Sequence, residues 1–278
     1  PTENYAGLCA AKRDMDRFLL KAEADGYSQV LCSYARIGLG FDSLRRELGH
    51  IPEGSPDGGM PLPDMMLGSS AVCDPRFKWY QATSRYLEVP TFGIDVVAPP
   101  PQADLNAVRD YYIQYQRDQL KGLIEFLETQ TGKKMDPDRL WEAIRLGDKA
   151  WQLWYDIDRL RVAIPCPMPS QDHFSIMVAG HYYTGTQIAV DFYQKLHDEV
   201  KYKVVNKIGV IPDEKHRILY GGGLPPWHTL WIFNYFESFG AVFVIENVYR
   251  GYDPVEVPSH VKDPVDFLAW RAFLRFTR

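Results

Sequence analysis

Short apolar runs alternate with segments of helical spacing along the first hundred residues. Residues 5–25 are rich in helix formers and stop at Gly26, which predicts one helix. The runs at 28–34 and 63–70 are short and apolar, as is typical of buried strands, and a helical segment follows each. Residues 89–96 form a third run of this kind. Because strands that alternate with helices usually form parallel sheets, we predict a parallel sheet here.

The pattern changes after three consecutive prolines at 99–101. Beyond them apolar residues recur at helical spacing, and Asp136 followed by Pro137 marks the start of a second long helix. Asp74-Pro75, with Asp74 as the N-cap, and Asp263-Pro264 likewise predict helix starts. Residues 164–169 contain three prolines and cannot lie inside a helix. We therefore expect a first α/β lobe, a helical segment and a second α/β lobe, at residues 1–98, 99–164 and 165–278.

The last hundred residues return to the alternating pattern. A strand at 217–223 enters a glycine turn, and a second strand at 241–248 follows the next helix. The predicted fold class is α/β, with two Rossmann-like parallel-sheet lobes, a helical layer between them and an incomplete second lobe. The helix predicted over 186–205 carries an apolar residue at every fourth position, namely Ile188, Phe192, Leu196, Val200 and Val204.

Composition and charge exclude several classes of protein. The 278 residues are 46% hydrophobic and 24% charged, which is enough apolar material for a folded core. A formal net charge of −5 argues against a general nucleic-acid binder, and no apolar stretch is long enough to cross a membrane. Four cysteines are too few for a disulfide scaffold, so we expect a cytoplasmic protein. Since the chain starts at Pro1 with no leader, we expect a processed start or a segment of a longer protein.

Several well-known catalytic motifs are absent from the sequence. The chain has no phosphate-binding G-x-x-x-x-G-K-[ST] loop and no G-x-G-x-x-G, so it shows no standard ATP or dinucleotide site. It also lacks H-E-x-x-H, G-x-S-x-G and C-x-x-C. These absences direct attention to where the cysteines and glycines lie along the predicted elements.

Two cysteines follow predicted strands of the first lobe. Cys32 and Cys73 are each expected near the carboxyl end of a buried parallel strand, the edge at which α/β sheets bind ligands. Thiols from neighbouring strands can converge on one zinc ion or iron–sulfur cluster, because both prefer thiolate ligands. The alternative is that each is a small buried core residue.

The remaining candidates each have an equally plain structural explanation. Cys9 lies mid-helix and Cys166 lies in the proline-rich loop, and packing is the simpler role for both. Glycines at 221–223 allow a ligand to approach the backbone, although a tight turn alone would also use them. Three histidines near predicted loops or helix starts are expected to be hydrogen-bonded bystanders, namely His173, His181 and His228.

Several segments together resemble one protein family. Cys32-Ser33-Tyr34-Ala35-Arg36 is similar to a C-S-Y-x-R motif, and residues 69–74 resemble a second motif that ends in Cys-Asp. The order and spacing of further segments also fit, at residues 165–174, 190–193, 221–226 and 239–242. The family is that of benzoyl-CoA reductases and 2-hydroxyacyl-CoA dehydratases, and the resemblance covers most of the chain.

The resemblance implies an oxygen-sensitive iron–sulfur subunit. In this family three cysteines hold a [4Fe–4S] cluster, and the first two correspond to Cys32 and Cys73. The third belongs to a later α/β segment that this chain is expected to lack, since neither Cys9 nor Cys166 occupies its position. The implied substrate is an aromatic or 2-hydroxyacyl CoA thioester. The residues expected to contact it are Ser170, Gln171, Gly221 and Gly222.

The resemblance also implies partners and a reaction. The expected partners are a homologous catalytic subunit and an ATP-hydrolysing iron–sulfur subunit that receives electrons from ferredoxin. ATP would therefore act only through a partner, which agrees with the missing nucleotide motifs. Similarity at 186–205 and 220–245 favours an ATP-dependent benzoyl-CoA reductase subunit. A 2-hydroxyacyl-CoA dehydratase subunit and a non-catalytic partner subunit remain the alternatives.

Overall fold

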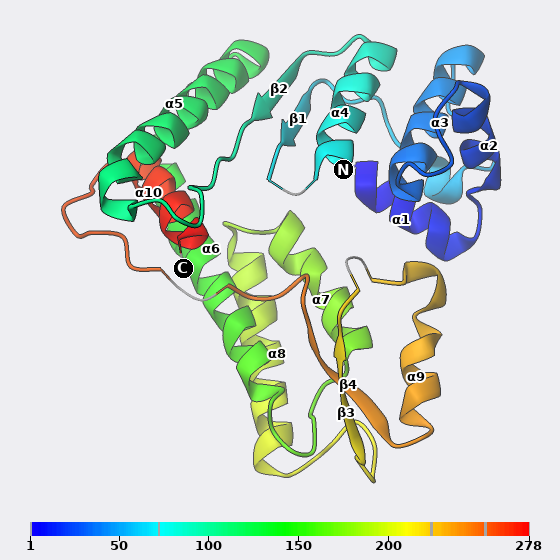
Figure 1. Ribbon diagram of the computed structural model, residues 1–278, viewed down its shortest axis with the longest axis vertical. Coiled ribbons are helices and arrows are strands. Elements are labelled where there is room, and N and C mark those ends of the chain that lie inside the picture. Colours follow the sequence, from blue (N-terminus) through cyan, green and yellow to red (C-terminus); the bar gives the residue numbers. More distant parts are fainter. Residues whose placement is uncertain (1, 72, 223–224, 253–254, 278) are drawn as a thin grey trace. The chain divides into compact units, whose positions relative to one another are not determined.

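The computed structural model describes residues 2–71, 73–222, 225–252 and 255–277. The chain divides into two compact units. Unit 1 comprises the residues up to Met135 together with those from Val257 onward, and unit 2 spans Asp136–Glu256 (Figure 1). Among the described residues, no helix combines the length and the apolar character needed to cross a lipid bilayer.

Unit 1 begins with helices packed around one apolar core. The core includes Phe18, Phe41 and Trp79, each almost fully buried. A single helix over 5–25 is a wrong prediction, because Arg13 adopts a positive φ of 56° and interrupts the helical backbone. The four helices of this region are α1 (Thr2–Lys12), α2 (Asp16–Ala24), α3 (Ser33–Leu48) and α4 (Asp74–Leu87).

The strand predicted over 28–34 is also wrong. Val30 is 94% exposed, and the backbone turns there, with Leu31 N–H donating to the Ser28 carbonyl at 3.0 Å. The Leu31 carbonyl accepts from Arg36 Nε at 3.2 Å, so the groups that would pair in a sheet are used locally. Cys32 therefore follows a turn instead of a buried strand.

The parallel sheet of unit 1 is confirmed in its two later strands. Strand β1 (Met66–Ser69) pairs in parallel with β2 (Thr91–Ile94), and α4 connects them. Helix α5 (Leu105–Thr131) contacts β2 through Phe92 and Phe126, whose ring centroids lie 5.5 Å apart. It also packs against α10 (Pro264–Phe276) through a small core of Ile113, Ala269 and Phe273.

Unit 2 contains a second parallel strand pair. Strand β3 (His216–Tyr220) pairs with β4 (Ala241–Glu246), with His216 opposite Ala241 and Tyr220 opposite Glu246. Both sheets, as far as the described residues extend, have two strands. The helices of unit 2 are α6 (Pro137–Leu160), α7 (Ser170–Tyr182), α8 (Gln187–Val205), the short 3-10 helix η2 (Trp227–Thr229) and α9 (Trp231–Glu237).

The core of unit 2 lies between α6, α7 and α8. Trp154 stacks on Tyr193 with ring centroids 5.4 Å apart, and both side chains are fully buried. The apolar stripe predicted for α8 is wrong in its first half, because Ile188 and Phe192 are 60% and 41% exposed. The buried face of α8 is rotated by one position and includes Ala189 and Tyr193.

The α/β class, with two parallel sheets and long helices, is confirmed. Helices α5 and α6, which the sequence groups in one segment at 99–164, belong to different compact units. Asp136 and Asp263 cap α6 and α10 through their side chains, as the Asp-Pro pairs predict. The boundaries of the three parts predicted from the sequence stay a prediction.

Candidate functional site

Cys32 is the residue immediately before the first turn of α3. Its side chain is exposed, and its carbonyl accepts the first helical hydrogen bond from Arg36 N–H at 3.0 Å. The Arg36 side chain contacts the residues around Cys32. It donates to the Leu31 carbonyl at 3.2 Å and to Glu23 of α2 at 2.6 Å. The arginine of the C-S-Y-x-R segment therefore holds the chain that leads into the cysteine.

Cys73 occupies the same position in front of α4. It is exposed, it is the N-cap residue, and Asp74 and Pro75 form the first turn. The sequence predicts Asp74 as the cap, so the structure moves the cap by one residue. Val72, which belongs to the second motif, lies outside the described residues. Both exposed cysteines thus precede the N-terminus of a helix in unit 1.

Two contacts fix the direction of α3 against α4. A Cβ atom on Gly38 would lie 1.9 Å from the Trp79 ring, so the two helices meet closely there. One turn later, Thr83 Oγ1 donates to Asp42 Oδ2 at 2.8 Å. Gly38 and Trp79 each lie six residues after their N-cap cysteine, whereas Asp42 and Thr83 each lie ten residues after it. The two contacts follow one another in the same order along α3 and along α4, so the helices run in the same direction. The structure therefore brings the two cysteines to the same end of the pair.

The other two cysteines differ from Cys32 and Cys73 in that both are buried. Cys9 and Cys166 are both fully buried, which confirms the packing role expected for them. Burial raises the pKa of Cys9 to about 11 and raises the pKa of Cys166 above its usual value, which disfavours thiolate. Within the described residues, no group of three or more His, Cys, Asp or Glu side chains is arranged to hold a metal ion.

The glycine turn lies at the carboxyl edge of the sheet in unit 2. Gly221 follows β3, and its carbonyl accepts from Asn247 Nδ2 at 3.4 Å, just beyond the end of β4. A Cβ atom on Gly222 would lie 2.5 Å from the Tyr220 ring, so a side chain there requires Tyr220 to move. Gly223 lies outside the described residues. Parallel sheets bind ligands at this edge, which keeps the turn a candidate contact for a ligand.

Ser170 and Gln171 begin α7 instead of lying in a loop. Ser170 is fully buried, and its hydroxyl donates to the Phe243 carbonyl of β4 at 3.0 Å. It also accepts from Arg161 Nη2 at 3.3 Å, so this hydroxyl is used within the protein. Gln171 Oε1 is buried, and no described residue donates to it. Of the two, only Gln171 has a polar atom left for a ligand.

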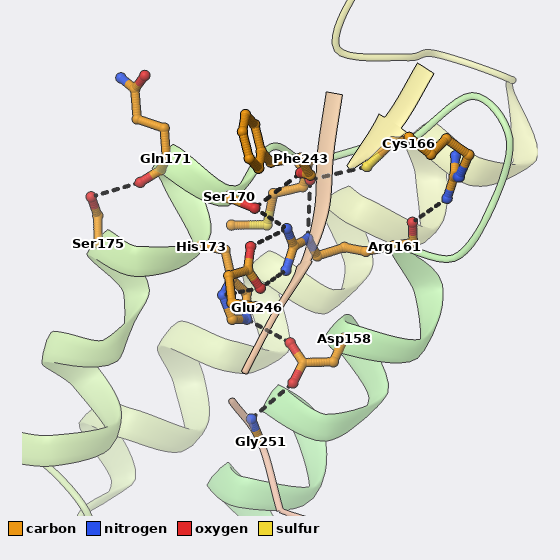
Figure 2. A network of polar contacts seen from close by, with 12 residues as sticks. Asp158, Arg161, Cys166, Ser170, Gln171, His173, Ser175, Phe243, Glu246 and Gly251 are labelled. Atoms are coloured by element: carbon orange, nitrogen blue, oxygen red, sulfur yellow. Dashed lines mark hydrogen bonds and ion pairs between the residues drawn. The ribbon is translucent and has the colours of Figure 1, made fainter. Parts of the chain in front are cut away.

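A buried network of charged side chains lies next to Ser170 (Figure 2). Arg161, the residue directly after α6, donates from Nη1 and Nη2 to the two carboxylate oxygens of Glu246, each at 2.7 Å. His173 of α7 lies between two acids, with Nε2 at 2.5 Å from Asp158 Oδ1 and Nδ1 at 3.1 Å from Glu246 Oε2. Asp158 also accepts from Gly251 N–H at 2.8 Å. The network therefore joins α6, α7, the end of β4 and the segment that follows it.

The charge state of Glu246 follows from these contacts. Burial by itself raises the pKa of Glu246, but the Arg161 guanidinium and His173 more than offset this and hold the pKa well below its usual range. Glu246 is therefore ionised and paired at neutral pH. Sequence reasoning missed this network and treated His173 as a bystander. The available signal was an acidic residue at the end of an otherwise apolar strand, Ala241–Glu246.

Comparison with known proteins supplies the family. Residues 6–277 match the family model described as 2-hydroxyglutaryl-CoA dehydratase, D-component. The chain is 31% identical over 221 residues to the (R)-phenyllactyl-CoA dehydratase alpha subunit of Clostridium sporogenes, covering 79% of this chain and 51% of that one. It is 29% identical over 228 residues to the (R)-2-hydroxyisocaproyl-CoA dehydratase alpha subunit of Clostridioides difficile, covering 81% and 52%.

A more distant relative points the same way. The alpha subunit of (R)-2-hydroxyglutaryl-CoA dehydratase from Acidaminococcus fermentans is 24% identical over 294 residues, covering 82% of this chain and 61% of that one. The chain spans about half the length of the first two relatives. All three are dehydratase subunits, so the comparisons favour the dehydratase alternative over the benzoyl-CoA reductase branch expected from the sequence. The match over nearly its whole length shows that the chain belongs to the 2-hydroxyglutaryl-CoA dehydratase D-component family.

Proposed function

We propose that the chain acts in an oxygen-sensitive 2-hydroxyacyl-CoA dehydratase, a lyase, and that Cys32 and Cys73 supply two ligands to its iron–sulfur cluster. The observation that carries this proposal is a pair of exposed cysteines at one end of two parallel helices, in a chain of this family. Thiolate donors are the ligands that iron–sulfur clusters use, so the donor chemistry of the pair fits such a cluster.

The residues present fit part of a cluster site. Two cysteines leave other coordination positions to be filled by groups other than Cys9 and Cys166, which are buried. When bound, a cluster of this kind supplies one-electron transfer at low potential to a CoA thioester. The contribution of this chain is to hold two ligands at a fixed spacing and to bind the substrate.

The substrate-binding part of the proposal concerns unit 2. We expect Gln171 Oε1 to accept a hydrogen bond from an N–H or O–H group of the acyl-CoA substrate, because this buried oxygen has no donor among the described residues. Gly221 and Gly222 lie at the carboxyl edge of the sheet, where the backbone is open to close approach by a ligand. Ser170 keeps α7 attached to β4, and we expect it to act by positioning Gln171.

The proposed partners follow from the family. The relatives described above are alpha subunits, which implies at least one further subunit in each of those enzymes. We propose that this chain likewise works with a homologous subunit and with an ATP-hydrolysing iron–sulfur protein that delivers electrons. The chain has no phosphate-binding loop of its own, so ATP would be consumed by the partner.

The test measures iron and acid-labile sulfide per chain after anaerobic purification together with any bound partners. We expect both elements in the unaltered chain and their loss in Cys32→Ser and Cys73→Ser. Cys9→Ala is the matched control, because Cys9 is buried and should not affect iron content. An intact chain, bound to its partners, that contains no iron would contradict the cluster and favour a non-catalytic subunit.

A further inference from the structure

We propose that Gly38, Asp42 and Thr83 are positioning residues that set the distance between the thiols of the two N-cap cysteines. The inference rests on the proposed cluster, for which it names the residues that hold both ligands in place. Cys32 and Cys73 lie on separate helices, so their spacing depends on how α3 and α4 are aligned. The contacts between those helices therefore control the site from a distance.

The first alignment contact is steric. The ring of Trp79 lies directly over Gly38, where a Cβ atom would come within 1.9 Å of Cζ2 and 2.4 Å of Cε2. Trp79 is 2% exposed and belongs to the core of unit 1, so its ring has little freedom to move aside. Only glycine fits at this point of α3 without moving one helix away from the other.

The same contact prevents the helices from sliding. A shift of α3 by one turn along α4 would bring the residue four positions away, Tyr34 or Asp42, to the place that Gly38 occupies. Either side chain would overlap the Trp79 ring far more than a methyl group does. The close approach at Gly38 thus selects one register.

The second alignment contact is a buried hydrogen bond. Asp42 is 0% exposed and Thr83 is 1% exposed, and the Thr83 hydroxyl donates to Asp42 Oδ2. The other carboxylate oxygen of Asp42 accepts from Arg45 Nη2 at 3.1 Å, within α3 itself. A change of register would leave Asp42 Oδ2 buried without its donor, which is strongly unfavourable. Thr83 is therefore the group that ties this acid to α4.

The alignment is transmitted rigidly to the cysteines. The two contacts lie six and ten residues into each helix, which corresponds to about 9 and 15 Å of helical rise. Arg36 binds the Leu31 carbonyl and Glu23, so Cys32 is fixed to the start of α3. A movement of one helix against the other therefore changes the separation of the two thiols directly.

The experiment measures that separation in the full chain without iron. Nitroxide labels are attached to Cys32 and Cys73, which are exposed, while the buried Cys9 and Cys166 are left unlabelled. Electron paramagnetic resonance then gives the distance distribution between the labels. We expect a longer and broader distribution in Thr83→Val and in Gly38→Ala. We expect no change in Thr83→Ser, which keeps the hydroxyl.

Ser55→Ala is the matched control, because it removes another buried hydroxyl of unit 1, one that donates to the Pro52 carbonyl outside α3 and α4. It should leave the label distance unchanged. If Gly38→Ala does not fold, Thr83→Val and its serine counterpart still decide the question. Distances equal to those of the unaltered chain in every folded variant would overturn the proposal.

A second readout separates this proposal from the cluster assignment. In unlabelled chains we expect Thr83→Val to lose iron to a chelator about 10-fold faster than Thr83→Ser, by analogy with the roughly 10- to 100-fold loss of metal affinity when groups that hold metal ligands in place are changed. If Thr83→Val alters the label distance but keeps its iron as firmly, the role in holding the cluster is overturned. If even the unaltered chain binds no iron, the cluster assignment fails while the label distances still test the alignment.

Discussion

Each unit buries a carboxylate beside an arginine, but the two acids have opposite pKa shifts. In unit 1, burial raises the pKa of Asp42 to about 6, although Thr83 and Arg45 act in the other direction. In unit 2, burial also acts to raise the pKa of Glu246, yet that pKa is held well below its usual range. Both side chains are almost fully buried, so burial alone does not explain the difference.

The difference lies in the donors. Glu246 receives two guanidinium N–H groups, one on each oxygen at 2.7 Å, and His173 lies beside it. Asp42 receives one neutral hydroxyl and a single arginine contact at 3.1 Å. Paired charge-assisted hydrogen bonds stabilise a buried carboxylate, whereas one of each kind does not fully offset its desolvation. The two regions thus show that donor number and geometry decide the ionisation of buried acids.

The largest expected effect comes from removing the donor pair of unit 2. Arg161→Met leaves Glu246 buried without its guanidinium, and breaking a buried ion pair in this way costs about 3–5 kcal/mol of unfolding free energy. Urea unfolding followed by tryptophan fluorescence measures the loss. Arg159→Met, at an exposed position in the last turn of α6, is the control and should change stability by less than about 0.5 kcal/mol. Equal stability of the two variants would contradict the network.

A second test uses pH to sharpen the contrast. The pKa of Asp42 rises from 3.8 to about 6 on folding, so its contribution to stability is present below pH 3.8 and is lost as pH rises through 6. The corresponding change is roughly 3 kcal/mol for a shift of about two pKa units. The pKa of Glu246 falls on folding, so its contribution is present above pH 4.5 and is lost as pH falls below that value.

Unfolding free energies of the unaltered chain, Asp42→Asn and Glu246→Gln, measured between about pH 4 and pH 7, check both signs. Relative to Asp42→Asn, the unaltered chain should become less stable as pH rises. Relative to Glu246→Gln, the unaltered chain should become more stable as pH rises from about 4, the lower end of the measured range. Parallel curves for the unaltered chain and Asp42→Asn would show that Asp42 does not titrate in this range.

The smallest expected effects compare two mid-helix glycines. Gly38→Ala in α3 forces a methyl group into the Trp79 ring, and overpacking of this kind costs about 1–3 kcal/mol. Gly147→Ala in α6 places its methyl 3.4 Å from Thr184 Cγ2, an ordinary contact. It should stabilise unit 2 by about 0.5–1 kcal/mol, because alanine favours helix over glycine. Thermal unfolding of both variants checks the opposite signs, and equal shifts in Tm would contradict the close packing at Gly38.

Sequence patterns predict the local elements well where one signal dominates. The Asp-Pro starts of α6 and α10 and the short apolar strands β1 to β4 are all found close to their predicted positions. The prediction of a strand at 28–34 was wrong because a short apolar run is consistent with a buried strand without establishing one. Here hydrogen bonds from Arg36 and within the turn decided the outcome, and neither is visible in the apolar pattern.

The sequence identified the two cysteines of the candidate site but not the contacts that bring them together. The strand predicted before Cys73 is found as β1, whereas the one predicted before Cys32 is a turn. The sequence did not predict that both cysteines are exposed N-cap residues. Their shared end depends on the equal spacing of Gly38 and Trp79 from the two cysteines, which has meaning only once α3 and α4 are known to touch. The network around Glu246 joins Arg161 and Glu246, which are 85 residues apart in the sequence, so no local sequence pattern predicts it.

The parallel alignment of α3 and α4 also has an electrostatic consequence. Each helix carries about half a positive elementary charge at its N-terminus, and two parallel helices place these like charges side by side. At an interaxial distance of about 8–10 Å they repel, and Asp74 in the first turn of α4 offsets part of that repulsion. An anionic group between the two thiols would turn this repulsion into attraction at both helices. The end of the pair that carries the cysteines therefore selects for occupants with net negative charge.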